Sequence, residues 1–160
     1  GQQDSRMGRQ ALVVKLTANI QLHELITPKI YEAAGKRAND FLHPELALTI
    51  QAIRDDINDP ITVCDWLWGG SYVDSGLRNP FDQQYVQFSA HRFGCAADLK
   101  FKEKTTDEVF DRIMSYQFLF PAITRIEAIE HTRTSHGALG RDWLHIEVGK
   151  RANNIQVFNP

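Results

Sequence analysis

Two histidines and an aspartate stand at spacings that suit a metal ion. His91 and Asp98 are separated by a short segment of small residues that includes Gly94 and Ala96, and such a segment can turn tightly enough to aim both side chains at one point. Two protein ligands hold zinc weakly, so a third is needed, and His145 in an alternating apolar stretch is the best candidate. Three ligands leave one position for water, whose pKa zinc lowers from about 16 to near 7. The sequence therefore predicts one Zn²⁺ per chain and the chemistry of a hydrolase.

Hydrolysis of an unactivated amide also needs a general base and a donor or cation for the developing oxyanion. Asp142 lies three residues before His145, and if the chain passes from a loop into a strand between them, its carboxylate faces the water without binding the metal. Asp142 is therefore the predicted base. Arg78 is the predicted partner of the oxyanion because a guanidinium cannot deprotonate and donates twice. The alternatives are a turn-capping role for Asp142 and a surface ion pair for Arg78.

Other residues compete for these roles. His131 and His136 lie close to His145 in the sequence, and either could be the third ligand or line the cleft and bind a substrate carboxylate. Glu127 and Glu130 are the runner-up bases, although both are expected to be solvated residues of a strand.

Ser89 is expected to orient the loop of the metal site rather than to act as a nucleophile, because a metal-bound histidine cannot serve as its base. Trp143 next to the third ligand, together with Trp66 and Trp68, could form a wall for substrate, but core aromatic residues need no such role.

The pattern of these residues resembles the signature of the zinc D-alanyl-D-alanine carboxypeptidase superfamily, which includes D,D-dipeptidases, bacteriophage L-alanyl-D-glutamate endolysins and hedgehog-like domains. The residues that carry the resemblance are Ser89, His91, Gly94, Ala96, Asp98, Asp142 and His145. Residues 75–80, Ser-Gly-Leu-Arg-Asn-Pro, are similar to the family's Ser-Gly-Tyr-Arg-Ser-Pro element, whose arginine contacts substrate near the scissile carbonyl. Over residues 61–150, the resemblance implies His91, Asp98 and His145 as zinc ligands, Asp142 as base and Arg78 as the arginine of the transition state.

The resemblance implies a zinc peptidase that cuts the stem peptides of peptidoglycan, and the chain looks most like small bacteriophage or prophage members. Either an endopeptidase at L-Ala-D-Glu or a carboxypeptidase at D-Ala-D-Ala fits. The alternative is a catalytically silent module of phage or cell-wall origin that keeps the fold and the zinc for binding or structure.

The bulk composition narrows the partners. The formal net charge of -2, with both signs mixed along the 160 residues, gives no footprint for nucleic acid or an anionic membrane. No apolar run approaches the roughly 20 residues that span a bilayer, and residues 1–10 lack the apolar core of a signal peptide. We expect a soluble monomer that stays in the host cytoplasm until its release to the cell wall, or that is carried in the virion. Cys64 and Cys95 are expected to be free thiols.

These residues must be positioned by a single α+β domain over residues 7–160, with helices first and a mainly antiparallel sheet after them. Residues 1–6 precede Met7 and are set aside as an appended or disordered segment. Apolar periodicity, caps and turn signals predict helices over residues 27–42, 46–57 and 105–116, and extended segments over residues 61–64, 72–78, 99–101, 124–130, 143–148 and 155–158. This arrangement places the metal ligands at the edge of the sheet.

Overall fold

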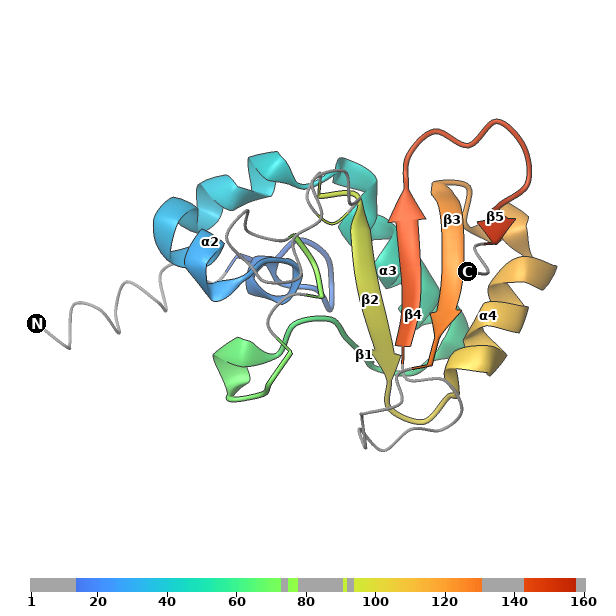
Figure 1. Cartoon of the computed structure of the whole chain (residues 1–160), viewed down its shortest axis with the longest axis horizontal. Coiled ribbons are helices and arrows are strands. Elements are labelled where there is room, and N and C mark those ends of the chain that lie inside the picture. Colours follow the sequence, from blue (N-terminus) through green and yellow to red (C-terminus); the bar gives the residue numbers. More distant parts are fainter. Residues whose placement is uncertain (1–13, 73–74, 78–90, 92–93, 131–142, 158–160) are drawn as a thin grey trace, which may run out of the picture.

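The computed structural model describes residues 14–72, 75–77, 91, 94–130 and 143–157. These residues form an α+β fold, as predicted (Figure 1). The α-helices are α2 (Pro28–Ala34), α3 (Pro44–Ile57) and α4 (Thr106–Ser115), and the 3-10 helices are η1 (Leu22–Leu25), η2 (Gly35–Phe41), η3 (Trp66–Trp68) and η4 (Gln117–Leu119). The strands are β1 (Ile61–Thr62), β2 (Ala96–Phe101), β3 (Ile123–Ile129), β4 (Trp143–Val148) and β5 (Gln156–Val157).

Helix α3 confirms the prediction from periodicity. Leu46, Ile50 and Ile53 are fully buried on one face of the helix. Pro44 occupies the first turn, where its missing N–H costs nothing, and the Nδ1 atom of His43 accepts a hydrogen bond of 3.1 Å from the first-turn backbone. The local sequence therefore specifies both the start of this helix and the face that it buries.

The helix predicted over residues 27–42 is interrupted. Helix α2 begins as expected after Thr27, whose side chain accepts a hydrogen bond from the backbone N–H of Ile30. It ends at Gly35, which has φ 55°, and the chain continues as the 3-10 helix η2. A positive φ is open to glycine at little cost and cannot continue an α-helix, so the single long helix was a wrong prediction.

The third predicted helix is confirmed as α4. Thr105 caps it by accepting a hydrogen bond of 3.0 Å from the backbone N–H of Glu108, as the capping pattern indicated. Val109 and Ile113 are buried on the face that turns toward the sheet.

The five strands form one sheet in the order β1-β2-β4-β3-β5, antiparallel except for the parallel pair β3–β5. The prediction that the metal ligands lie at the edge of the sheet is wrong for His145, because β4 lies between β2 and β3. Strand β1 pairs with β2 only at Lys100 and Phe101, and at Asp98 the outer side of β2 contacts the backbone of Ser75. Of the extended stretch predicted over residues 72–78, the described part forms only a single parallel bridge, between Ile26 and Leu77. Residues 73, 74 and 78 lie outside the described residues.

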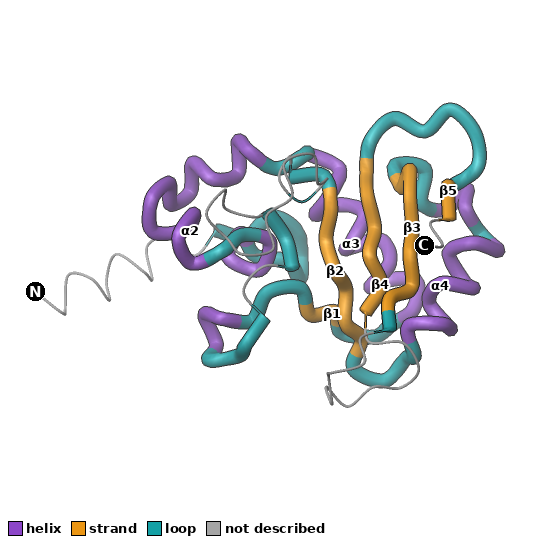
Figure 2. The backbone as a smooth tube through the Cα atoms, in the orientation of Figure 1, coloured by secondary structure: helices purple, strands orange, loops and turns teal. Residues whose placement is uncertain are grey.

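One face of the sheet carries apolar core residues, and the other face carries the proposed metal ligands of β2 and β4. Leu99, Leu144 and Ile146 are fully buried, and helix α3 lies behind the strands in Figure 1 while α4 lies alongside β3. Because side chains alternate along a strand, Asp98 and His145 lie on the opposite face. Figure 2 shows helical segments on both sides of the sheet, with α2 on the left and α4 on the right, and α3 behind it. Cys64 and Cys95 form no disulfide bond, as predicted. Among the described residues, no helix has the length and apolar character that crossing a membrane requires.

Candidate metal centre

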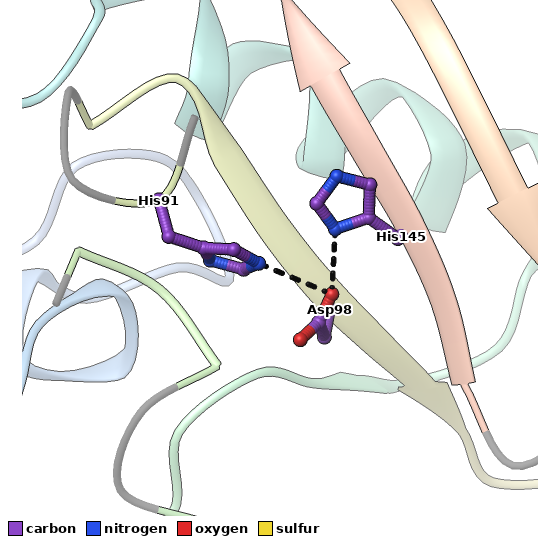
Figure 3. Close-up of side chains that lie close together, drawn as sticks. All are labelled: His91, Asp98 and His145. Atoms are coloured by element: carbon purple, nitrogen blue, oxygen red, sulfur yellow. Dashed lines mark hydrogen bonds and ion pairs between the residues drawn. The ribbon is translucent and has the colours of Figure 1, made fainter. Parts of the chain in front are cut away.

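Three side chains that the sequence singled out converge on one point of the sheet (Figure 3). Asp98 of β2 and His145 of β4 are cross-strand partners, and His91 reaches the same point from a turn on the other side of β2. The Oδ1 atom of Asp98 lies 2.9 Å from His145 Nδ1 and 3.4 Å from His91 Nε2. The potential ligand atoms of all three residues lie within 4.8 Å of one another.

These separations fit a metal ion. Ligand atoms about 2.0–2.1 Å from a tetrahedral zinc ion are about 3.3 Å apart, close to the two distances from Asp98. His91 and Asp98 are buried, with exposed fractions of 3% and 8%, and burial protects such a centre from competing water. Two imidazoles and one carboxylate are a donor set that suits zinc. The group could hold a metal ion.

The outer nitrogens of both imidazoles contact hydrogen-bond acceptors. His91 Nδ1 lies 2.9 Å from the carbonyl oxygen of Gly76. A carbonyl only accepts, so Nδ1 carries a proton, and in a neutral ring Nε2 is the nitrogen whose lone pair a metal ion beside Asp98 would use. His145 Nε2 lies 2.8 Å from Oε2 of Glu147, which leaves Nδ1 on the side of Asp98. Each ring therefore presents one nitrogen to the centre and anchors the other in the protein, as metal-binding histidines do.

The segment Ser75–Leu77 lies beside β2 and forms hydrogen bonds with two of the proposed ligands. Its Ser75 carbonyl accepts a hydrogen bond of 2.8 Å from the backbone N–H of Asp98, and its Gly76 carbonyl contacts His91. Leu77 donates its N–H to the carbonyl of Leu25 at 2.7 Å. Two of the three ligands are thus tied to one short segment, which η1 holds in place.

Lys100 fastens the same segment from the sheet. Its ammonium donates to the Ser75 hydroxyl and the Val63 carbonyl, both at 2.7 Å, and to the Asp98 carbonyl at 3.1 Å. It also lies 4.1 Å from the centre of the Tyr72 ring, a distance at which a cation is attracted to the ring face. Because Lys100 follows Asp98 by two residues on one strand, both side chains lie on the same face.

The turn that delivers His91 depends on Gly94. This glycine has φ 70°, donates its N–H to the carbonyl of His91 at 3.3 Å and accepts a hydrogen bond of 3.0 Å from the N–H of His43. A Cβ at this position would collide with the carbonyl oxygen of Phe41. Only glycine combines this backbone conformation with so close an approach.

The charges of the centre reinforce one another. Burial alone would raise the pKa of Asp98, but hydrogen bonds from His145 and His91 hold it well below its usual range. Burial alone would lower the pKa of His145, whereas its hydrogen bonds to Asp98 and Glu147 raise it to about 9. The hydrogen bond from His145 lowers the pKa of Glu147. The two carboxylates therefore favour a positive charge at His145, and a metal cation would supply such a charge at the same place.

The structure brings together the three predicted ligands. Arg78, Ser89, His131, His136 and Asp142 lie outside the described residues, so their roles stay predictions.

Trp143 is the first residue of β4 and is partly buried. Trp66 donates its indole N–H to the carbonyl of Ile26 at 2.9 Å and contacts the ring of Tyr31, whereas Trp68 is 61% exposed. These contacts give Trp66 a packing role, and a substrate wall of three tryptophans stays a prediction.

Sequence reasoning assigned no role at the metal centre to the residues that contact the ligands. Glu147 and Lys100 each follow a ligand by two positions in a strand, and this spacing puts them on the face of that ligand. The strand period could have identified both. Ser75 and Gly76 act through backbone groups, for which side-chain patterns give no signal.

Comparison of the chain with models of protein families, with curated proteins and with solved structures finds no match.

Proposed function

We propose that this chain is a zinc-dependent peptidase that hydrolyses stem peptides of peptidoglycan and is related to the zinc D-alanyl-D-alanine carboxypeptidase superfamily. The observation that carries the proposal is the convergence of His91, Asp98 and His145, with each imidazole anchored through its outer nitrogen. A zinc ion held by these residues would supply a Lewis acid and an activated water.

The residues that complete the site are proposed from the sequence. Arg78 directly follows Leu77, the last residue of the segment that supports His91 and Asp98. Asp142 directly precedes Trp143, where β4 begins. In this proposal the Asp142 carboxylate accepts a proton from the attacking water, and the Arg78 guanidinium stabilises the negative charge that develops on the carbonyl oxygen.

Mass spectrometry of purified peptidoglycan after incubation with the protein tests the proposal. Zinc-loaded protein is expected to release new fragments, whose masses identify the bond between L-Ala and D-Glu or between two D-Ala residues. A chelated sample and the Asp142→Asn variant are expected to release none. Asp111→Asn, the same change at an exposed position of α4, is the matched control and should keep full activity.

The result separates the proposed peptidase from a silent module. Stoichiometric zinc, measured by elemental analysis, without any new fragment would refute the peptidase and leave a metal-containing binding module. A chain that binds no metal would refute the proposed centre itself.

A further inference from the structure

We propose that Glu147 is a positioning residue of the metal centre, which selects the Nδ1 atom of His145 as the metal ligand by accepting the Nε2 proton. The inference rests on the metal ion of the proposed function and does not depend on which bond is hydrolysed. Glu147 does not belong to the predicted ligand set.

The geometry of β4 places Glu147 for this role. His145 and Glu147 are two residues apart in a regular strand and therefore lie on one face of the sheet. The Oε2 atom of Glu147 lies 2.8 Å from His145 Nε2, while Nδ1 of the same ring lies 2.9 Å from Asp98 Oδ1. An ionised carboxylate accepts and cannot donate, so the contact with Glu147 keeps a proton on Nε2. A metal ion bound beside Asp98 would then take the place of the proton on Nδ1, which is the nitrogen left to bind it.

A second contact directs the carboxylate. Arg125 of β3 is the cross-strand partner of Glu147, and its Nη1 atom lies 4.0 Å from the same Oε2. The guanidinium side chain is 36% exposed and that of Glu147 21%, so the pair contributes orientation more than stability. The Glu147 carboxylate is thus oriented by two contacts, one with His145 on the same strand and one with Arg125 on the adjacent strand β3.

The two histidines are anchored differently. His91 donates to the neutral carbonyl of Gly76, whereas His145 contacts a carboxylate. A carboxylate behind a metal-binding imidazole makes the ring a stronger donor than a carbonyl does, and removing such a partner costs about 10–100-fold in metal affinity. Glu147 should therefore contribute to zinc affinity as well as to the orientation of the ring.

Three variants test the inference. Glu147→Leu removes the acceptor, and Glu147→Gln keeps an acceptor oxygen but removes the charge. Glu127→Gln is the matched control, because Glu127 is the cross-strand partner of His145 on β3 and loses the same charge beside the same residue. The dissociation constant of zinc is measured by competition with a chromophoric chelator, and the protonated nitrogen of His145 is identified by nitrogen-edited NMR of the zinc-loaded protein.

We expect Glu147→Leu to weaken zinc binding by about 10–100-fold, Glu147→Gln to weaken it less, and Glu127→Gln to leave it unchanged. In the wild type and in Glu147→Gln, the NMR spectrum should place the proton of His145 on Nε2, and in Glu147→Leu that proton should exchange faster with water.

Equal zinc affinity in Glu147→Leu and the wild type would overturn the inference, and so would an equal loss in Glu127→Gln, which would indicate charge alone. If Glu147→Leu does not fold, a proton on Nδ1 in zinc-loaded wild type or Glu147→Gln refutes the inference, and a proton on Nε2 supports it. A wild type that binds no zinc refutes it as well. If the Glu147 variants change zinc affinity as expected but the wild type releases no peptidoglycan fragment, the proposed peptidase is refuted and the role of Glu147 stands.

Discussion

Glu24 makes the stability of this fold depend on pH in a direction opposite to that of most carboxylates. Its side chain is only 4% exposed, and its Oε2 accepts a hydrogen bond of 2.7 Å from the backbone N–H of Gln21. Burial raises the pKa of Glu24 from 4.5 to about 7, and the hydrogen bond from Gln21 only partly opposes it. The folded protein therefore retains a proton that the unfolded chain loses above pH 4.5.

The size of the effect follows from the two pKa values. Each pKa unit is worth about 1.4 kcal/mol, so the difference between 4.5 and about 7 corresponds to about 3 kcal/mol. The folded state binds the extra proton between these pH values, so this contribution falls as the pH rises. The resulting loss in the free energy of unfolding is absent below pH 4.5 and complete above pH 7. Glu24→Gln keeps an acceptor oxygen for Gln21 and removes the titration.

Urea unfolding of the wild type and of Glu24→Gln over a series of pH values measures this contribution. The free energy of unfolding of the variant relative to the wild type should increase by about 3 kcal/mol between acidic and mildly alkaline pH. Glu32→Gln, the same change at an exposed position, is the matched control. A constant difference for Glu24→Gln would refute the reasoning, because it would mean that Glu24 titrates alike in the folded and unfolded states.

Three further outcomes are expected. Gly94→Ala should cost several kcal/mol in urea unfolding and weaken zinc binding, because the added Cβ meets the Phe41 carbonyl at a positive φ; unchanged unfolding would contradict this. Lys100→Met keeps the aliphatic stem but loses the three hydrogen bonds of the ammonium, so calorimetry should show a melting temperature several degrees lower, and an equal melting temperature would exclude the role of the ammonium. Zinc at 100 times its dissociation constant should stabilise the wild type by about 2.7 kcal/mol and should stabilise Asp98→Asn far less; equal stabilisation of both would remove Asp98 from the metal centre.

Local patterns in the sequence predicted one of the strands that carry the site and a helix of the core, whereas the strand predicted at residues 99–101 begins at Ala96 and contains Asp98. The alternation from Trp143 to Val148 identified β4, and the spacing of Leu46, Ile50 and Ile53 identified α3. Both patterns follow from burial on one face, which local sequence records directly. The three metal ligands could also be selected from the sequence, but for a different reason, because their residue types and spacing suit the binding of a metal ion.

The arrangement of the elements could not be predicted in this way. No local pattern shows that β4 lies between β2 and β3, because strand order depends on contacts between distant residues. The interruption at Gly35 follows from a positive φ that the helical periodicity does not reveal. The segment Ser75–Leu77 is irregular and acts through backbone groups, so its role became visible only from its hydrogen bonds to Asp98, His91 and Leu25.

The position of β4 has a consequence for the order of events during synthesis. Strand β3 leaves the ribosome before β4, although β4 lies between β2 and β3 in the sheet. Strands β2 and β3 therefore each expose an unpaired edge until β4 has inserted between them. Asp98 and His145 are 47 residues apart in the chain, and the ligand set is complete only after β4 has inserted. The proposed metal centre therefore cannot form before β4 has left the ribosome and paired with β2 and β3, and any metal-dependent activity begins only after that step.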